Sequence, residues 1–171
     1  ERFAYEQTRR RDDDDEGGFG QAAGDTDAVV QIMAHTSQLE QAVELVEAYP
    51  ELRYTCDHFA HADAADDPAE SFAGFELPAE YDNVTVKLSE IAHTSNKDFP
   101  YEDAYDHVRW LLNTFGRERI LWGSDFPNVS HPEFGGMSYK ETRSWLNHVD
   151  FLTDADRRWL VDEAARSFLL G

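Results

Sequence analysis

The pattern of hydrophobic and polar positions changes near residue 28. Before it, the basic triplet Arg9 to Arg11 precedes an acidic run at 12–16 and several glycines, with few apolar side chains. Such a composition predicts a flexible segment over residues 1–27. From Ala28 to the end, short apolar runs alternate with apolar residues at helical spacing. This texture predicts one ordered domain over 28–171.

Strand-length runs rich in apolar and β-branched residues predict strands over 28–34, 52–57, 83–91 and 119–125. Apolar residues at helical spacing predict helices over 39–46, 101–115, 139–148 and 153–170, with a short helix around 72–77. Ser37 is placed to cap the first of these helices, and Gly116 to end the second. Thr153 with Asp156 fits a capping box for the last helix.

The order strand then helix, repeated four times, predicts an α/β fold with parallel strands and helical crossovers. Four such units fit either a small open sheet or half of an eight-unit barrel, and periodicity does not distinguish the two. The chain of 171 residues is short for a whole (β/α)8 barrel, which typically needs about 250.

The composition is strongly acidic, with 35 acidic and 15 basic residues and a formal charge of -20. This charge argues against binding to nucleic acid or to an anionic membrane surface. The acids are spread along the chain while lysine is nearly absent, which favours adaptation to high salt over a localised acidic interaction surface. The single cysteine, Cys56, fits a reducing cytoplasm. No apolar run approaches the roughly 20 residues of a membrane span.

Groups able to bind a metal or move a proton follow each predicted strand. In chain order they are His35, the pair Asp57 and His58, His93, and Asp125. Because the carboxyl ends of parallel strands lie on one face, these side chains are expected to converge there. Imidazole and carboxylate together suit zinc or a similar divalent ion, and a carboxylate beside it suits a general base. The pattern predicts a hydrolytic site.

Each of these residues also has an ordinary interpretation. An isolated histidine is more often at the surface or hydrogen-bonded in the core than a ligand. Lys87 fits a substrate-binding cation, but strand lysines also extend to the rim. Cys56 is better explained as a buried filler than as a nucleophile. The sequence carries no phosphate loop, dinucleotide fingerprint or G-x-S-x-G elbow, which argues against kinases, Rossmann dehydrogenases and serine hydrolases.

Several motifs taken together resemble the amidohydrolase-related (amidohydrolase 2) family, in its lactone-hydrolase branch. The resemblance covers roughly Ala28 to the end and rests on YPELRYTCDHFAHAD at 49–63, NVTVKLSEIA at 83–92, FGRERILWGSDFP at 115–127 and SYKETRSWL at 138–146. It implies a TIM-barrel fold in which the four strands are the fifth to eighth of the barrel. The chain is thus expected to be the C-terminal half.

The resemblance also implies roles for individual residues. Asp125 matches the family's metal ligand or general base, and His58 a metal-site or substrate-polarising histidine. His35 matches a further metal ligand that the lactonase branch often lacks. Lys87 and Ser89 match a substrate-rim motif. His93, chosen by its place after the third predicted strand rather than by the resemblance, is expected to bind substrate with them. The implied cofactor is a divalent metal, zinc by preference, although a lactonase-type site can lack one.

Two of the departures from the family pattern bear on the site. Glu90 stands where the family has glycine after the Lys-Leu-Ser motif, which is expected to alter the substrate pocket. The family's His-x-His on the first barrel strand has no counterpart in these residues. The leading hypothesis is therefore a hydrolase acting on a lactone or similar small-molecule carbonyl. The alternatives are a related metal-dependent decarboxylase, and a non-catalytic half-barrel that needs a partner, either the missing N-terminal half or a second copy.

Overall fold

The computed structural model describes residues 23, 28–64, 66–134 and 136–170. The segment 1–27 that the sequence sets apart lies outside this part, except for Ala23, which is buried. The strands are β1 (Val29–Ile32), β2 (Arg53–Cys56), β3 (Val84–Leu88) and β4 (Ile120–Trp122). They form one sheet in the order β1-β2-β3-β4, with every neighbouring pair parallel. The predicted α/β class with TIM-barrel-type (β/α) units is confirmed.

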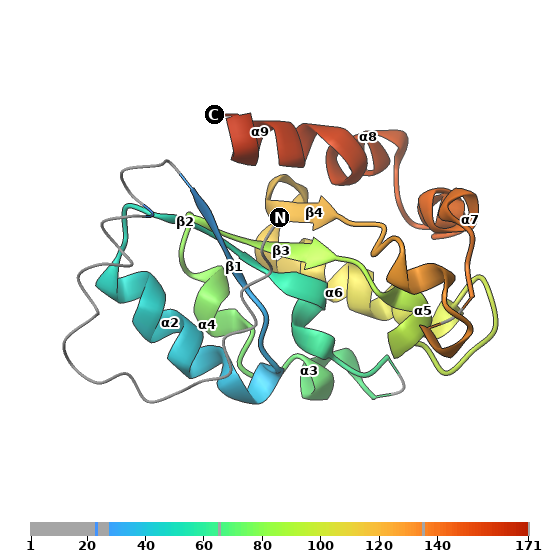
Figure 1. Cartoon of the computed structure of the whole chain (residues 1–171), viewed down its shortest axis with the longest axis horizontal. Helices are drawn as coiled ribbons and strands as arrows, with labels where there is room; N and C mark the ends of the chain where they lie inside the picture. The colour runs from blue at the N-terminus through green and yellow to red at the C-terminus, as the bar shows by residue number, and fades with distance from the viewer. Residues whose placement is uncertain (1–22, 24–27, 65, 135, 171) are drawn as a thin grey trace.

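The α-helices are α2 (Leu39–Ala48), α3 (Pro68–Ser71), α4 (Glu76–Ala79), α5 (Ile91–Thr94), α6 (Tyr105–Phe115), α7 (Tyr139–Ser144), α8 (Asp154–Arg158) and α9 (Ala164–Leu170). A π-helical turn, Trp159–Glu163, joins α8 to α9. Figure 1 shows α2, α4 and α6 on one side of the sheet, and α8 and α9 running along β4 on the other. None of the helices in the described ranges is long and apolar enough to cross a membrane.

Short 3-10 turns, Thr36–Gln38, Glu102–Ala104, Arg117–Arg119, Asn128–Ser130, Pro132–Phe134 and Trp145–Asn147, link these elements. The turn Thr36–Gln38 corrects the prediction that Ser37 caps the following helix. The N–H of Gln38 already bonds the His35 carbonyl at 2.8 Å, so the chain turns before Leu39 and Ser37 lies inside the turn. Gly116 ends α6 with φ 74°, and Thr153 and Asp156 form the predicted capping box.

Two other boundaries differ from the prediction because the backbone turns left-handed. Tyr101, with φ 58°, separates the preceding loop from the helical turns, so α6 begins at Tyr105 rather than at 101. Glu90, with φ 59°, ends the extended chain, so that β3 stops at Leu88 and α5 starts at Ile91. The alternating pattern over 83–91 therefore covers a strand, a turn and the start of a helix.

An aromatic cluster fills the layer between the sheet and its helices. Phe72 is fully buried, and its ring centroid lies 4.7 Å from that of Trp110 and 5.5 Å from that of Phe75. The strand side chains Val84, Val86 and Ile120 are likewise fully buried. Burial of this apolar surface is the main term that fixes the sheet against its helices. Because the strands are parallel, the loops that follow them lie at one common edge of the sheet.

Candidate active site

Three polar side chains follow three neighbouring strands in left-handed turns. His58 comes after β2 with φ 49°, Glu90 after β3 with φ 59°, and Asp125 after β4 with φ 54°. In Figure 1 the arrowheads of β3 and β4 point toward α5 and α7, the end where these turns lie. Residues other than glycine adopt positive φ uncommonly and at a cost in free energy, and such residues cluster at functional sites.

The same three side chains form a group with metal-binding chemistry. One ring nitrogen of His58 and one carboxylate oxygen each of Glu90 and Asp125 lie within 4.8 Å of one another. Two ligands about 2.1 Å from a shared zinc ion lie at most about 4.2 Å apart. The donor types therefore fit a divalent ion, and small side-chain movements would bring them to ligating separations.

Hydrogen bonds and ion pairs surround the His58 ring. His58 Nδ1 lies 2.9 Å from Ser89 Oγ and 3.8 Å from Glu90 Oε1. The other oxygen of Glu90 lies 3.1 Å from His61 Nδ1. Glu90 thus stands between two imidazoles, with its side chain largely buried.

A buried ion pair lies beside this group. Lys87 Nζ is 2.7 Å from Asp57 Oδ1, and the Asp57 side chain is only 5% exposed. Gly123 leaves room for this arrangement, because a Cβ there would lie 3.1 Å from the Lys87 stem and 3.2 Å from Ser89 Cβ. Such close approach requires glycine or a shift of the lysine.

The pKa values reflect burial and crowding of like charges. Burial, reinforced by the negative charge of Glu90, raises the pKa of Asp125. Burial lowers the pKa of His58, although Glu90, Asp57 and Asp125 oppose the shift. The hydrogen bond to Glu90 raises the pKa of His61. Burial acts to raise the pKa of Glu90, but the contacts with His61 and His58 outweigh it and lower that pKa. A carboxyl with a raised pKa is a stronger base toward water.

Two predicted site residues lie at the margin of this group. His35 is exposed at the end of β1, and its ring centroid is 5.2 Å from that of His61. His93 is exposed on α5, and its backbone N–H donates to the Glu90 carbonyl at 2.9 Å. Within the described part of the chain, neither belongs to the three-residue group of possible ligands.

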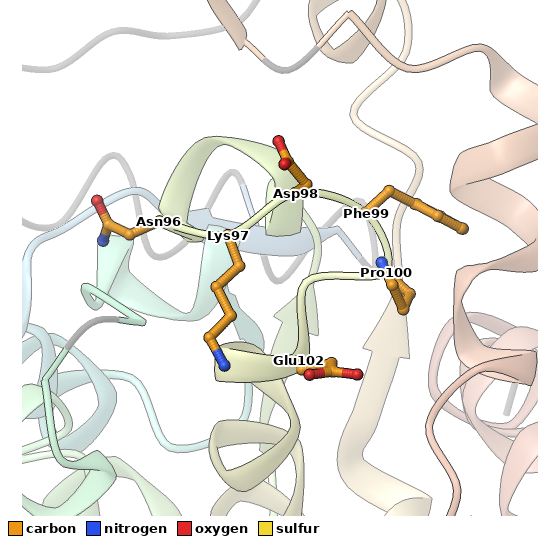
Figure 2. A pocket seen from close by; sticks show the side chains of 6 residues that line it. All are labelled: Asn96, Lys97, Asp98, Phe99, Pro100 and Glu102. Atoms are coloured by element: carbon orange, nitrogen blue, oxygen red, sulfur yellow. The ribbon is translucent and has the colours of Figure 1, made fainter.

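A separate surface hollow of about 490 Å³ lies in the loop after α5. Figure 2 shows its lining, with the Lys97 side chain extending toward Glu102 and Asp98 pointing away from both. The remaining lining residues are Asn96, Phe99 and Pro100. None of the predicted site residues lines it, so the hollow is not the candidate site.

Comparison with known proteins agrees with this arrangement. A family model described as amidohydrolase matches residues 4–170. The chain belongs to the amidohydrolase family. No curated protein matches it in sequence. Solved amidohydrolase structures share its fold, as the following similarities show.

A Burkholderia multivorans amidohydrolase with bound zinc is 20% identical with a TM-score of 0.74, and the match covers 88% of this chain and 55% of that one. A probable 2-pyrone-4,6-dicarboxylic acid hydrolase from Acinetobacter baumannii with citric acid bound is 16% identical with a TM-score of 0.75, covering 92% and 58%. The 2,6-dihydroxybenzoate decarboxylase from Rhizobium is 12% identical with a TM-score of 0.61, covering 89% and 54%. The chain therefore spans a little over half the length of these structures.

The structure brings some of the predicted site residues together and adds others that were not predicted. His58 and Asp125 lie together as expected, while Ser89 is buried against His58 and Lys87 is paired with Asp57. Sequence reasoning did not anticipate Glu90 as a donor or His61 as its partner. The one signal for Glu90 was that it stands where the resembling family has glycine, a departure interpreted from the sequence as a change in the substrate pocket. The catalytic and ligand roles of all these residues stay predictions.

Proposed function

We propose that this amidohydrolase chain carries the metal-binding and proton-transfer half of a hydrolytic site for a lactone or similar carbonyl. The observation that supports it is the group of His58, Glu90 and Asp125 on three neighbouring strand ends. Each of the three is held in left-handed backbone. The proposal assigns His58 and the two carboxylates to a divalent ion, with zinc preferred because the donors are imidazole and carboxylate.

In the proposed reaction, a bound ion and the protein side chains have different roles. A bound divalent ion supplies Lewis acidity that polarises the carbonyl. The Asp125 carboxylate takes a proton from water as the water oxygen bonds to the carbonyl carbon. When the ring C–O bond breaks, Asp125 returns that proton to the leaving oxygen. The products are a carboxylic acid and an alcohol, and Asp125 is regenerated.

The neighbouring residues orient these groups. The Lys87 amine neutralises Asp57, the residue directly before His58, and so limits the negative charge at the site. We assign Lys87 to holding this strand end in place, and His93 and His35 to the rim that faces substrate.

The test replaces the carboxylate that carries the proposal. Asp125→Asn in the complete protein is expected to lower kcat for hydrolysis of 2-pyrone-4,6-dicarboxylate or a simple lactone by about 10²- to 10⁴-fold, because the general base is lost. The same change is expected to weaken zinc binding by the purified chain, measured by calorimetric titration. Asp98→Asn, an exposed carboxylate in the separate hollow, is the matched control and should change neither quantity. Turnover that survives Asp125→Asn contradicts the assignment.

Decarboxylation is the second candidate, favoured by the shared fold of the Rhizobium decarboxylase. Release of carbon dioxide from 2,6-dihydroxybenzoate, with no lactone hydrolysis, would support it over the hydrolase. A third possibility, a non-catalytic half-barrel, predicts neither zinc binding at His58 and Asp125 nor turnover after the chain is combined with a complementary half.

A further inference from the structure

Two buried serine-histidine pairs occur in the described part of the chain. Ser89 Oγ lies 2.9 Å from His58 Nδ1, and Ser71 Oγ lies 2.9 Å from His107 Nε2. The first pair adjoins the carboxylate group, whereas the second lies in the aromatic layer beside Phe72. The two bonds have the same length but use different ring nitrogens, and the two pairs lie in different surroundings.

Ser89 is held in a closely packed position. It is 2% exposed, directly follows β3, and its Cβ lies against Gly123, where even one added carbon would approach to 3.2 Å. A side chain so enclosed has little freedom to turn toward a substrate. Its hydroxyl is directed instead to the His58 ring.

The surroundings of His58 Nδ1 favour one position for the ring proton. Two oxygens lie near Nδ1: the Ser89 hydroxyl oxygen at 2.9 Å, which can accept or donate, and Glu90 Oε1 at 3.8 Å. A nearby carboxylate favours a proton on Nδ1 over a lone pair, which its negative charge would repel. With the proton on Nδ1, Nε2 keeps its lone pair and is available as a metal ligand or base.

We infer that Ser89 is a positioning residue that holds neutral His58 in the Nδ1–H tautomer, so that Nε2 faces outward from the Ser89 contact as the donor atom. As far as it concerns a metal ligand, this inference rests on the proposed function. It assigns Ser89 to the histidine rather than to the substrate rim. A hydrogen bond of this kind to the second ring nitrogen fixes the orientation of a ligating histidine and raises metal affinity.

The first measurement needs neither metal nor substrate. In the metal-free full chain with ¹⁵N-labelled histidine at pH 8, where an ordinary histidine is neutral, the nitrogen shifts of His58 are expected to show Nδ1 protonated and Nε2 unprotonated. His58→Gln assigns the signals. A wild-type ring protonated on Nε2 overturns the inference, whatever the metal affinity proves to be.

The second measurement compares matched variants. Ser89→Ala is expected to lower the population of the Nδ1–H tautomer and to weaken zinc binding about 10-fold or more. Ser71→Ala removes the equivalent bond to His107 and controls for the loss of a buried hydrogen bond, so its stability should fall similarly while zinc affinity stays unchanged. Equal zinc affinity in Ser89→Ala and wild type, with the tautomer unchanged, overturns the positioning role.

The two measurements separate this inference from the proposed function. A tautomer that shifts in Ser89→Ala, in a chain that binds no zinc, supports the positioning role and contradicts the metal site. If Ser89→Ala fails to fold, the wild-type tautomer decides the inference, and Ser89→Cys, whose sulfur is a weaker acceptor, provides the graded comparison.

Discussion

The two buried serine-histidine pairs have similar hydrogen bonds but lie in different surroundings. The pair Ser71 and His107 lies within the helical layer, where the Phe72 ring packs edge-on to the imidazole at 5.2 Å. The pair Ser89 and His58 lies at the strand ends beside Glu90 and the Lys87 and Asp57 ion pair. A buried hydrogen bond is common to both. What distinguishes the second is the concentration of charge and of left-handed backbone, and these mark it as the candidate for chemistry.

The largest stability effect should come from the aromatic layer around the first pair. Phe72→Ala removes a fully buried ring that contacts Phe75 and Trp110, so the free energy of unfolding should fall by about 3–5 kcal/mol. Denaturant unfolding measures this loss. Zinc affinity per folded molecule should change much less than stability, because the Phe72 ring packs on Phe59, the residue after His58, rather than on a donor side chain.

The control for this prediction is Phe126→Ala. Phe126 follows Asp125 directly but is 60% exposed, so its truncation should change stability by only about 0.5 kcal/mol. A loss of zinc affinity in Phe72→Ala, measured below its unfolding transition, would show that the two regions are not independent.

The next prediction concerns strain at the strand ends. Glu90→Gly and Glu90→Gln both remove the carboxylate, but only glycine adopts φ 59° without cost. Glu90→Gly should therefore be more stable to unfolding than Glu90→Gln by about 1 kcal/mol. Both variants should bind zinc more weakly than the wild type, by calorimetric titration.

This pair of variants separates two claims. Equal stability of the glycine and glutamine variants would contradict the cost assigned to the left-handed backbone. Unchanged zinc affinity in both would instead remove Glu90 from the ligand group while leaving the backbone argument intact.

The sequence predicted the sheet because the strands have distinctive patterns. The expected runs at 52–57 and 119–125 contain β2 (Arg53–Cys56) and β4 (Ile120–Trp122), and parallel order followed from the helices between them. His58 and Asp125 could be placed together for the same reason, since both follow the carboxyl ends of parallel strands.

The rest of the candidate site depends on backbone that the pattern does not reveal. Glu90 reaches His58 and His61 because its own backbone is left-handed, and no glycine or asparagine at that position signals such a turn. His61 lies at the end of a run of left-handed residues that begins at His58. His35 was grouped with the ligands by its place after a strand, yet it is exposed beside His61. The sequence thus predicts that polar side chains converge at one edge of the sheet, whereas turn geometry decides which residues belong to that group.

The smallest predicted effect is on the pH dependence of the unfolding free energy, and it comes from His107 in the Ser71 and His107 pair. Burial lowers the pKa of His107 despite the opposing bond to the Asp103 carbonyl. An unfolded histidine titrates near about 6.5, so below that pH the unfolded chain takes up a proton that the folded His107 resists. Its contribution is therefore fully present above the unfolded pKa and is lost as pH falls through the lower folded value.

His107→Gln should consequently show a shallower fall in unfolding free energy between pH 8 and 5.5 than the wild type, because this residue no longer titrates. The slope is the relevant measurement, since truncating a buried side chain also lowers stability at every pH. Lys97→Gln, on an exposed loop, leaves His107 in place and should keep the wild-type slope. A His107→Gln slope equal to that of the wild type would mean that the folded chain accommodates the charged imidazole. The aromatic layer would then tolerate a charged side chain, as the strand-end site does, despite its apolar packing.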